Sequence, residues 1–273
     1  QFKLFKRKYQ ILLKKLNYFF FLMSKSKVYF TKEISPESLI KIYELLGTEL
    51  KDKVAVKIST GEPGGHNFLN PKLIKDLVNK INGTLVECLT AYPGKRNTVK
   101  DHWQTFEDHG FKSIAPCDLL DEEGTIDLPI TGGKHLQSHD IVGSHITNYK
   151  SSLILSHFKG HIRGGFGGAL KNMSIGFASA EGKTWIHTAG KSSIVGEFWQ
   201  KIAEQDDFLE SMAEACEALV SFFKPENLAY INIANNLSID CDCCSNPKPP
   251  EMADIGIFAS LDPVAIDQCC YDA

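Results

Sequence analysis

The chain of 273 residues lacks the marks of export, of membrane insertion and of common nucleotide binding. Within the first 24 residues the longest uncharged run, 16–24, has nine residues, whereas a helix that spans a bilayer needs about 20. No small-residue cleavage site follows that run. Neither G-x-G-x-x-G nor G-x-x-x-x-G-K-[ST] occurs in the chain. We therefore expect a cytoplasmic protein that neither binds a membrane nor carries a standard nucleotide-binding motif.

The eight cysteines do not form the repeated C-x2-C loops of zinc ribbons or four-iron ferredoxins. Because no export signal is present, a reducing compartment without disulfides is expected. A predicted strand is followed by Cys241, Cys243 and Cys244. These cysteines could bind a metal ion or cluster, or they could have a structural role only. The remaining cysteines are expected to pack against apolar neighbours: Cys88, Cys117, Cys216, Cys269 and Cys270.

Charge is distributed unevenly along the chain. Residues 1–22 contain six basic residues and no acid, and without them 24 basic residues face 33 acidic ones, a formal charge of −9. An acidic body argues against a general nucleic-acid partner. We predict that 1–22 is a non-native or disordered leader and that Met23 is the true start. Residues 23–273 are predicted to form a single domain that is incomplete at its C-terminus.

Apolar strands alternate with helices along the chain, which predicts an α/β fold with a mostly parallel central sheet flanked by helices. Ligands of such sheets collect at the carboxyl ends of the strands, where the loops 61–66 and 157–168 are expected. Strands are predicted at 28–30, 54–58, 84–89, 152–157, 229–234 and 255–260. Helices are predicted at 35–47, 70–81, 98–109, 166–177, 194–204, 208–223 and 263–273.

The segment 156–172 is the most concentrated candidate site, with five glycines among histidines and basic residues. His157 and His161 lie on one side whether the segment is helical or extended, so they are candidate metal ligands. Positive side chains and free N–H groups at a helix start suit an anion. The predicted anion-binding residues are Lys159, Arg163, Gly164, Gly165, Gly167, Gly168, Lys171 and Asn172.

The other histidines are weaker candidates. His66 follows a predicted strand, His145 precedes the strand at 152–157, and His187 follows the glycine-rich helix, so these three are further candidates for the site. Four more lie in polar surroundings and are expected at the surface: His102, His109, His135 and His139. We also expect the loops 157–171 and 241–244 to face one cleft, because each follows a predicted strand of a parallel sheet.

Three motifs in this order resemble a bacterial and archaeal family known as uncharacterised Fe–S centre proteins, domain of unknown function 362. They are the segment 156–172, the run Cys241-Asp242-Cys243 and the ending 254–268, within a resemblance that covers 27–273. Many members carry a ferredoxin-like module after the glycine-rich helix. The matching region here, 182–208, contains no cysteine, so a ferredoxin-type four-iron cluster is not expected. The resemblance implies a possible metal ion or iron–sulfur cluster but no established reaction.

Three functions remain open from the sequence. The first is a metal- or iron–sulfur-associated redox protein that binds a small anionic ligand or a redox partner. The second is a non-redox, metal-assisted enzyme acting on a small anionic substrate, for which lactate-racemase-like nickel enzymes are a distant analogy. The third is an accessory protein that binds a ligand in the same cleft without turnover.

Overall fold

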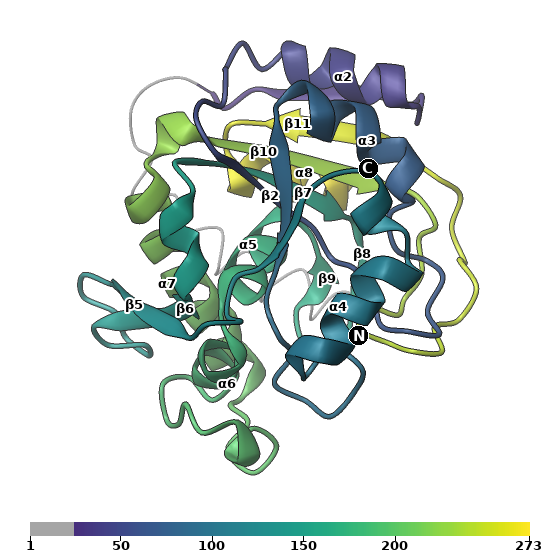
Figure 1. The fold of residues 1–273 in the computed structure, drawn as a ribbon. Helices are drawn as coiled ribbons and strands as arrows, with labels where there is room; N and C mark the ends of the chain where they lie inside the picture. Colours follow the sequence, from purple (N-terminus) through teal and green to yellow (C-terminus); the bar gives the residue numbers. More distant parts are fainter. Residues whose placement is uncertain (1–24) are drawn as a thin grey trace.

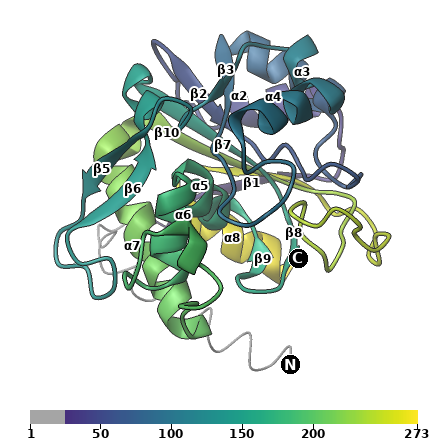
Figure 2. The same cartoon turned by 60° about the horizontal axis from the view of Figure 1, so that its bottom comes forward.

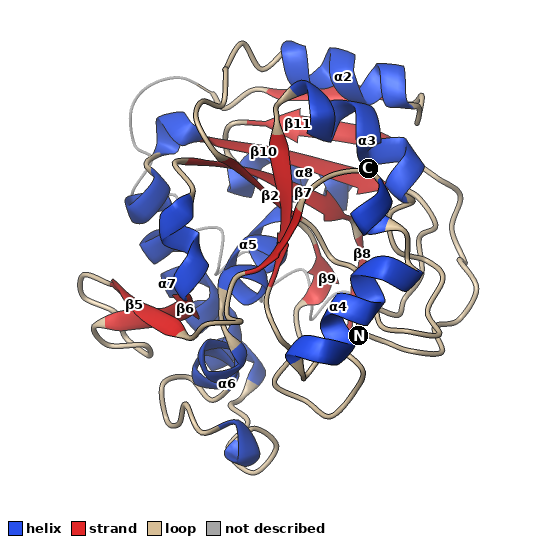
Figure 3. Cartoon of the chain, viewed as in Figure 1, coloured by secondary structure: helices blue, strands red, loops and turns tan. Residues whose placement is uncertain are grey.

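The computed structural model describes residues 25–273, so the predicted leader lies outside the described residues. A seven-stranded sheet with the order β1-β11-β10-β7-β2-β3-β4 forms the centre (Figures 1 and 3). The five strands from β10 to β4 are parallel, and β11 is antiparallel to both β10 and β1. The predicted α/β fold with a mostly parallel sheet is confirmed. The strands are β1 (Val28–Thr31), β2 (Val54–Lys57), β3 (Gly83–Glu87), β4 (Cys117–Leu119), β7 (Ser151–His157), β10 (Leu228–Ala234) and β11 (Gly256–Ser260).

Helices cover both faces of this sheet, and Figure 2 shows the two layers. Alternate residues of each strand point to opposite faces, so Leu153 and Leu155 of β7 join one core while Ile154 joins the other. One layer consists of α2 (Pro36–Glu44), α3 (Pro71–Lys80) and α4 (Val99–Asp108). The other consists of α5 (Ala169–Phe177), α6 (Ala180–His187), α7 (Gln205–Phe223) and α8 (Pro263–Asp272).

Local sequence signals explain where several helices begin. Ser35, Asn70 and Asp262 each accept a backbone N–H at the start of a helix whose first turn contains a proline. The apolar runs of β7 and β10 are fully buried, as expected for central parallel strands with helices on both faces. None of the helices described over residues 25–273 is long and apolar enough to cross a membrane.

Two predicted helices differ from the structure. The helix predicted at 194–204 is wrong, because only a 3-10 turn, Val195–Glu197, forms there. Ile194 and Trp199 remain exposed, so this segment buries no apolar stripe that would stabilise a helix. The helix predicted at 166–177 begins at Ala169, because the glycines before it pair in a small hairpin.

Several short elements were not predicted from the sequence. They are β4, α6, the hairpin of β5 (Thr125–Pro129) and β6 (His139–Gly143), and the hairpin of β8 (Lys159–His161) and β9 (Gly165–Gly167). The β8–β9 hairpin directly follows β7 and extends from the carboxyl edge of the parallel strands. It therefore brings its polar residues to the edge where ligands of α/β sheets usually bind.

Candidate functional site

A cavity of about 110 Å³ lies at the carboxyl edge of the parallel strands. The glycine-rich segment and the cysteine loop both line it, which confirms the prediction that they face one cleft. Its polar lining residues are Lys57, Ser59, Glu87, Thr90, Tyr92, Arg96, Ser156, His157, Lys159, His161, Lys171, Asn172, Lys183, His187, Cys241 and Cys243.

The β8–β9 hairpin forms one wall of the cavity. Lys159 and His161 are two residues apart on β8, so they share a side, and both are buried. Gly160 between them donates its N–H to the carbonyl oxygen of Ser238 at 2.9 Å. A Cβ at Gly160 would lie 2.4 Å from the carbonyl oxygen of Ile239, so glycine is required for this approach. The hairpin therefore holds the cysteine loop against the cavity.

Asp242 anchors the cysteine loop from inside the protein. Its carboxylate accepts a hydrogen bond from Nδ1 of His157 at 2.9 Å and pairs with Nζ of Lys159 at 2.7 Å. The other ring nitrogen of His157, Nε2, donates to the carbonyl oxygen of Asn235 at 2.6 Å. Both nitrogens of His157 are thus occupied by protein acceptors, and this histidine acts in the structure as an anchor.

Cys241, Cys243 and His161 converge on the cavity. One ligand atom from each, two sulfurs and a ring nitrogen, lies within 4.8 Å of the others. Cys244 and His157, also predicted as ligands, are not part of this group. In the described part of the chain one further group of possible ligands converges in this way: His135, Asp207 and Glu210. There, Nζ of Lys134 already pairs with Glu210 at 2.7 Å.

The two thiols share one proton in an electropositive setting. The hydrogen bond from Cys243 and the neighbouring Lys171 and Lys159 hold the pKa of Cys241 well below its usual value. The same hydrogen bond and burial raise the pKa of Cys243 well above it. Nζ of Lys171 lies 3.9 Å from the sulfur of Cys241. The pair therefore consists of a thiolate at Cys241 and a thiol at Cys243.

His161 is neutral in this setting. Burial and the nearby positive charge of Lys171 hold its pKa well below the usual value. The backbone N–H of Gly164 donates to Nδ1 of the ring at 2.8 Å. Because Nδ1 accepts this hydrogen bond, the single ring proton is on Nε2.

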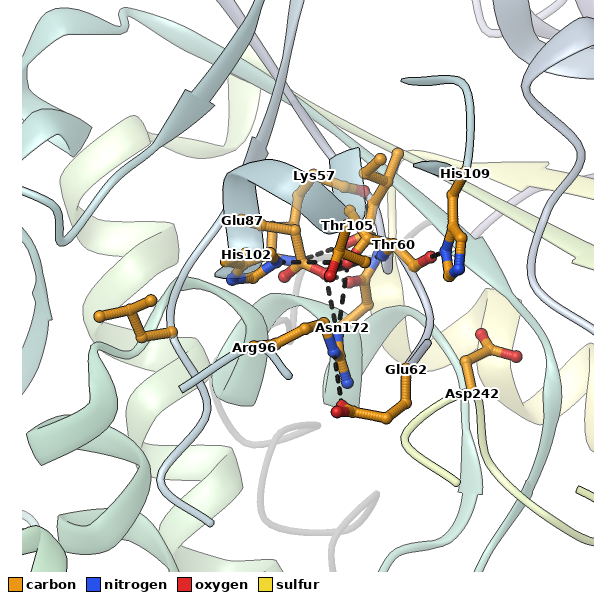
Figure 4. Close-up of polar contacts among 12 residues, drawn as sticks. Lys57, Thr60, Glu62, Glu87, Arg96, His102, Thr105, His109, Asn172 and Asp242 are labelled. Carbon is orange, nitrogen blue, oxygen red and sulfur yellow. Dashed lines mark hydrogen bonds and ion pairs between the residues drawn. The ribbon is translucent and has the colours of Figure 1, made fainter. Parts of the chain in front are cut away.

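A buried charge network forms another part of the cavity wall, and Figure 4 shows its residues. Nζ of Lys57 is 2.8 Å from a carboxylate oxygen of Glu87, and a guanidinium nitrogen of Arg96 lies 3.6 Å from the other. Arg96 also pairs with Glu62 at 2.9 Å. These side chains come from the ends of β2 and β3 and from the loops that follow them. This network was not predicted from the sequence. A signal was present, because Lys57 and Glu87, which have opposite charges, are the last residues of two neighbouring apolar strands.

His102 belongs to the same buried region, so its predicted surface position is wrong. Its ring is fully buried, lies 3.3 Å from Oγ1 of Thr60, and stacks on Phe106 with 5.4 Å between ring centroids. Burial lowers the pKa of His102 to about 3. The residue sits four positions before Phe106 on α4 and shares its buried face, a spacing that could have revealed its burial.

Comparisons with known proteins place the chain in a family. Residues 54–272 match the family described as "Domain of unknown function (DUF362)", which is most of the chain. The chain belongs to the DUF362 family.

This DUF362 chain is also similar to one solved structure and to one curated protein. The lactate racemase apoprotein from Thermoanaerobacterium thermosaccharolyticum superposes with a TM-score of 0.51 at 13% sequence identity, over 89% of this chain and 56% of that chain. This likeness shows a shared fold. Competence protein ComM of Haemophilus influenzae is 30% identical over 112 residues, which are 41% of this chain and 19% of ComM. The chain thus spans about half of the racemase and a fifth of ComM.

The start of the glycine-rich helix of this DUF362 chain is held by an internal carboxylate. Asp267 on α8 accepts the N–H groups of Ala169 at 2.7 Å and Leu170 at 3.0 Å. Arg163 donates to the carbonyl oxygen of Ala203, and Gly167 pairs with Lys159 in the β8–β9 ladder. The helix start that we expected to meet an external anion is therefore satisfied by the protein itself.

Of the other predicted anion-binding residues, Lys171 points its ammonium group toward the cavity beside Cys241. Asn172 binds the ends of two strands, since its Nδ2 donates to the carbonyl oxygens of Lys57 at 3.0 Å and Leu155 at 3.1 Å. Gly164 contributes the N–H that orients His161, and Gly165 adopts φ +85° at the hairpin turn. These residues shape the cavity wall.

Replacing Gly168 with alanine is expected to destabilise the protein by about 1–3 kcal/mol. A Cβ there would lie 2.3 Å from Oδ1 of Asp267 and would push the carboxylate off the helix start. Urea unfolding of Gly168→Ala measures the effect. Gly196→Ala is the matched control, because an added Cβ at Gly196 meets no atom within 4 Å. Equal stability of the two variants would contradict the assigned role of Asp267.

Proposed function

We propose that this chain is a metal-dependent enzyme that acts on a small anionic substrate and holds its metal through Cys241, Cys243 and His161. The convergence of their ligand atoms within 4.8 Å at the wall of the cavity supports this proposal. Two thiolates and one imidazole suit zinc and other borderline divalent ions. Three protein ligands also leave a coordination position open, as in catalytic zinc sites. A bound ion would supply Lewis-acid polarisation of a substrate oxygen.

The donor set fits a single ion better than an iron–sulfur cluster. Four thiolates usually hold a four-iron cluster, whereas the group found among residues 25–273 contains two. The proton shared by the cysteines must leave when both sulfurs bind a metal. The protonated Nε2 of His161 must likewise lose its proton or change tautomer if that atom binds. Metal affinity is therefore expected to rise with pH.

An anionic substrate is favoured by the charges that face the cavity. Lys57, Arg96 and Lys159 each pair with a carboxylate within 4.0 Å. Within the described residues, Lys171 and Lys183 have no carboxylate at that distance. Burying a cation without a counter-charge is costly. Nζ of Lys171 already lies 3.9 Å from the sulfur of Cys241, so the buried Lys183 is the ammonium group that a negatively charged ligand would offset.

Metal content tests the proposal directly. Protein purified anaerobically is expected to contain about one equivalent of a divalent metal by elemental analysis. Cys241→Ser and Cys243→Ser are expected to lose it, because each removes one of the two thiolates. Cys244→Ser and Cys269→Ser are matched controls that should keep the metal, since neither residue belongs to the convergent group. Equal metal content in all four variants would refute the assigned ligand set.

A further inference from the structure

Helix α6 brings two polar residues to the cavity that the proposed metal site does not use. Lys183 and His187 are four residues apart, so they lie on one face of the helix, and both line the cavity. The side chain of Ser179 accepts the N–H of Gly182 and caps the helix start. A regular helix thus holds an ammonium group and an imidazole side by side.

The ring of His187 is fixed in orientation and tautomer. Nδ1 lies 2.7 Å from the carbonyl oxygen of Lys183, which can only accept, so Nδ1 carries the ring proton. Burial lowers the pKa of His187 to about 3, which keeps the ring neutral. The rings of Phe198 and Phe208 pack against it with centroids 4.8 Å and 4.5 Å away. Nε2 is therefore an acceptor, and it has no hydrogen-bond partner among residues 25–273.

Lys183 retains donors for a ligand. Its Nζ donates to the carbonyl oxygen of Ala178 at 2.5 Å, and the side chain is buried. An ammonium group has three donors, so this contact leaves capacity for an anion. Lys171 and Arg163 add positive charge near His187. The surroundings of the free Nε2 acceptor are therefore cationic.

We propose that α6 binds the substrate as a small hydroxy acid, with its carboxylate on Lys183 and its hydroxyl donating to Nε2 of His187. This inference rests on the proposed function and names the substrate class. An acceptor nitrogen requires a donor on the ligand, and the cations around it would repel an ammonium group, which excludes an amino acid. The cavity of about 110 Å³ is well below the ~300–1,000 Å³ of pockets for drug-sized ligands, so the acid has few atoms.

Calorimetric titration of the full chain with glycolate, acetate and glycine tests the proposal. Glycolate is expected to bind about tenfold more tightly than acetate, because only glycolate offers a hydroxyl to Nε2. Glycine should bind more weakly than acetate. His187→Phe keeps an aromatic ring packed against Phe198 and Phe208 but removes the acceptor, so it should bind glycolate and acetate equally. Lys183→Gln should lower the affinity for both acids at least about tenfold. Lys191 is exposed and lies outside the cavity, so Lys191→Gln should bind both acids as the wild type does.

Two outcomes would overturn the proposal: retained glycolate preference in His187→Phe, or unchanged acetate affinity in Lys183→Gln. If either variant fails to fold, the ¹⁵N shift of His187 Nε2 in the wild-type protein decides, since glycolate but not acetate should move it. Metal content of the same samples separates the two proposals. If the wild-type protein prefers glycolate to acetate but contains no metal, only the metal site is refuted. If it contains metal but does not prefer glycolate, only the role of α6 is refuted.

Discussion

Replacing Glu87 with glutamine is expected to lower the free energy of unfolding by about 3–5 kcal/mol. The side chain of Glu87 is 6% exposed and that of Lys57 1%, and the two groups are 2.8 Å apart. Glutamine keeps the shape but leaves Lys57 buried without its counter-charge, while Arg96 keeps Glu62. Urea unfolding near neutral pH measures the loss.

The matched control is Glu44→Gln. Glu44 pairs with Lys80 at the same distance of 2.8 Å, but the two side chains are 53% and 42% exposed. Water screens such a pair, so its loss should cost less than about 1 kcal/mol. If Glu87→Gln is no more destabilising than Glu44→Gln, the buried network contributes little to stability.

The pH dependence of stability gives a second measure of Glu87. Burial alone would raise its pKa, but Lys57 and Arg96 lower it to about 2, against about 4.3 in an unfolded chain. A carboxyl group with a lowered folded-state pKa stabilises the protein fully above the unfolded pKa. That contribution is lost as the pH falls from about 4.3 to about 2. The free energy of unfolding of the Glu87→Gln variant should therefore fall less than that of the wild type over this pH range.

The sheet could be predicted from the sequence because its strands are buried on both faces. The runs that became β2, β3, β7, β10 and β11 are apolar and lie between helices with clear starts. Helix α6 escaped prediction for a physical reason. Its residues Lys183 and His187 face a polar cavity, so the helix lacks the apolar stripe by which helices are recognised.

The meeting of the two loops was predictable, because parallel strands deliver their following loops to one edge. The different roles of the histidines within these loops were not predictable. His157 and His161 have equivalent positions in the sequence pattern, yet only His161 joins the cysteines. The difference arises from Asp242 and Asn235, which are about 80 residues away from His157 in sequence and occupy both its ring nitrogens. Such long-range partners leave no local signal.

Replacing Asp242 with asparagine is expected to destabilise the protein by about 3–5 kcal/mol and to weaken metal binding by about 10- to 100-fold. The carboxylate is fully buried between Nδ1 of His157 at 2.9 Å and the ammonium group of Lys159 at 2.7 Å. Burial would raise its pKa, but these partners hold it well below the usual value, so it is ionised. Asparagine would leave the buried Lys159 without its carboxylate partner.

A double-mutant cycle separates the charge effect from the packing effect. Lys159→Met in the Asp242→Asn background removes the uncompensated cation, so it should restore part of the lost stability. Metal affinity should stay weak in the double variant, because Asp242 lies between Cys241 and Cys243 and its anchoring directs both thiols to the cavity. Stability is measured by urea unfolding and affinity by competition with a chelator. Wild-type metal affinity in Asp242→Asn would show that the thiols converge without this anchor.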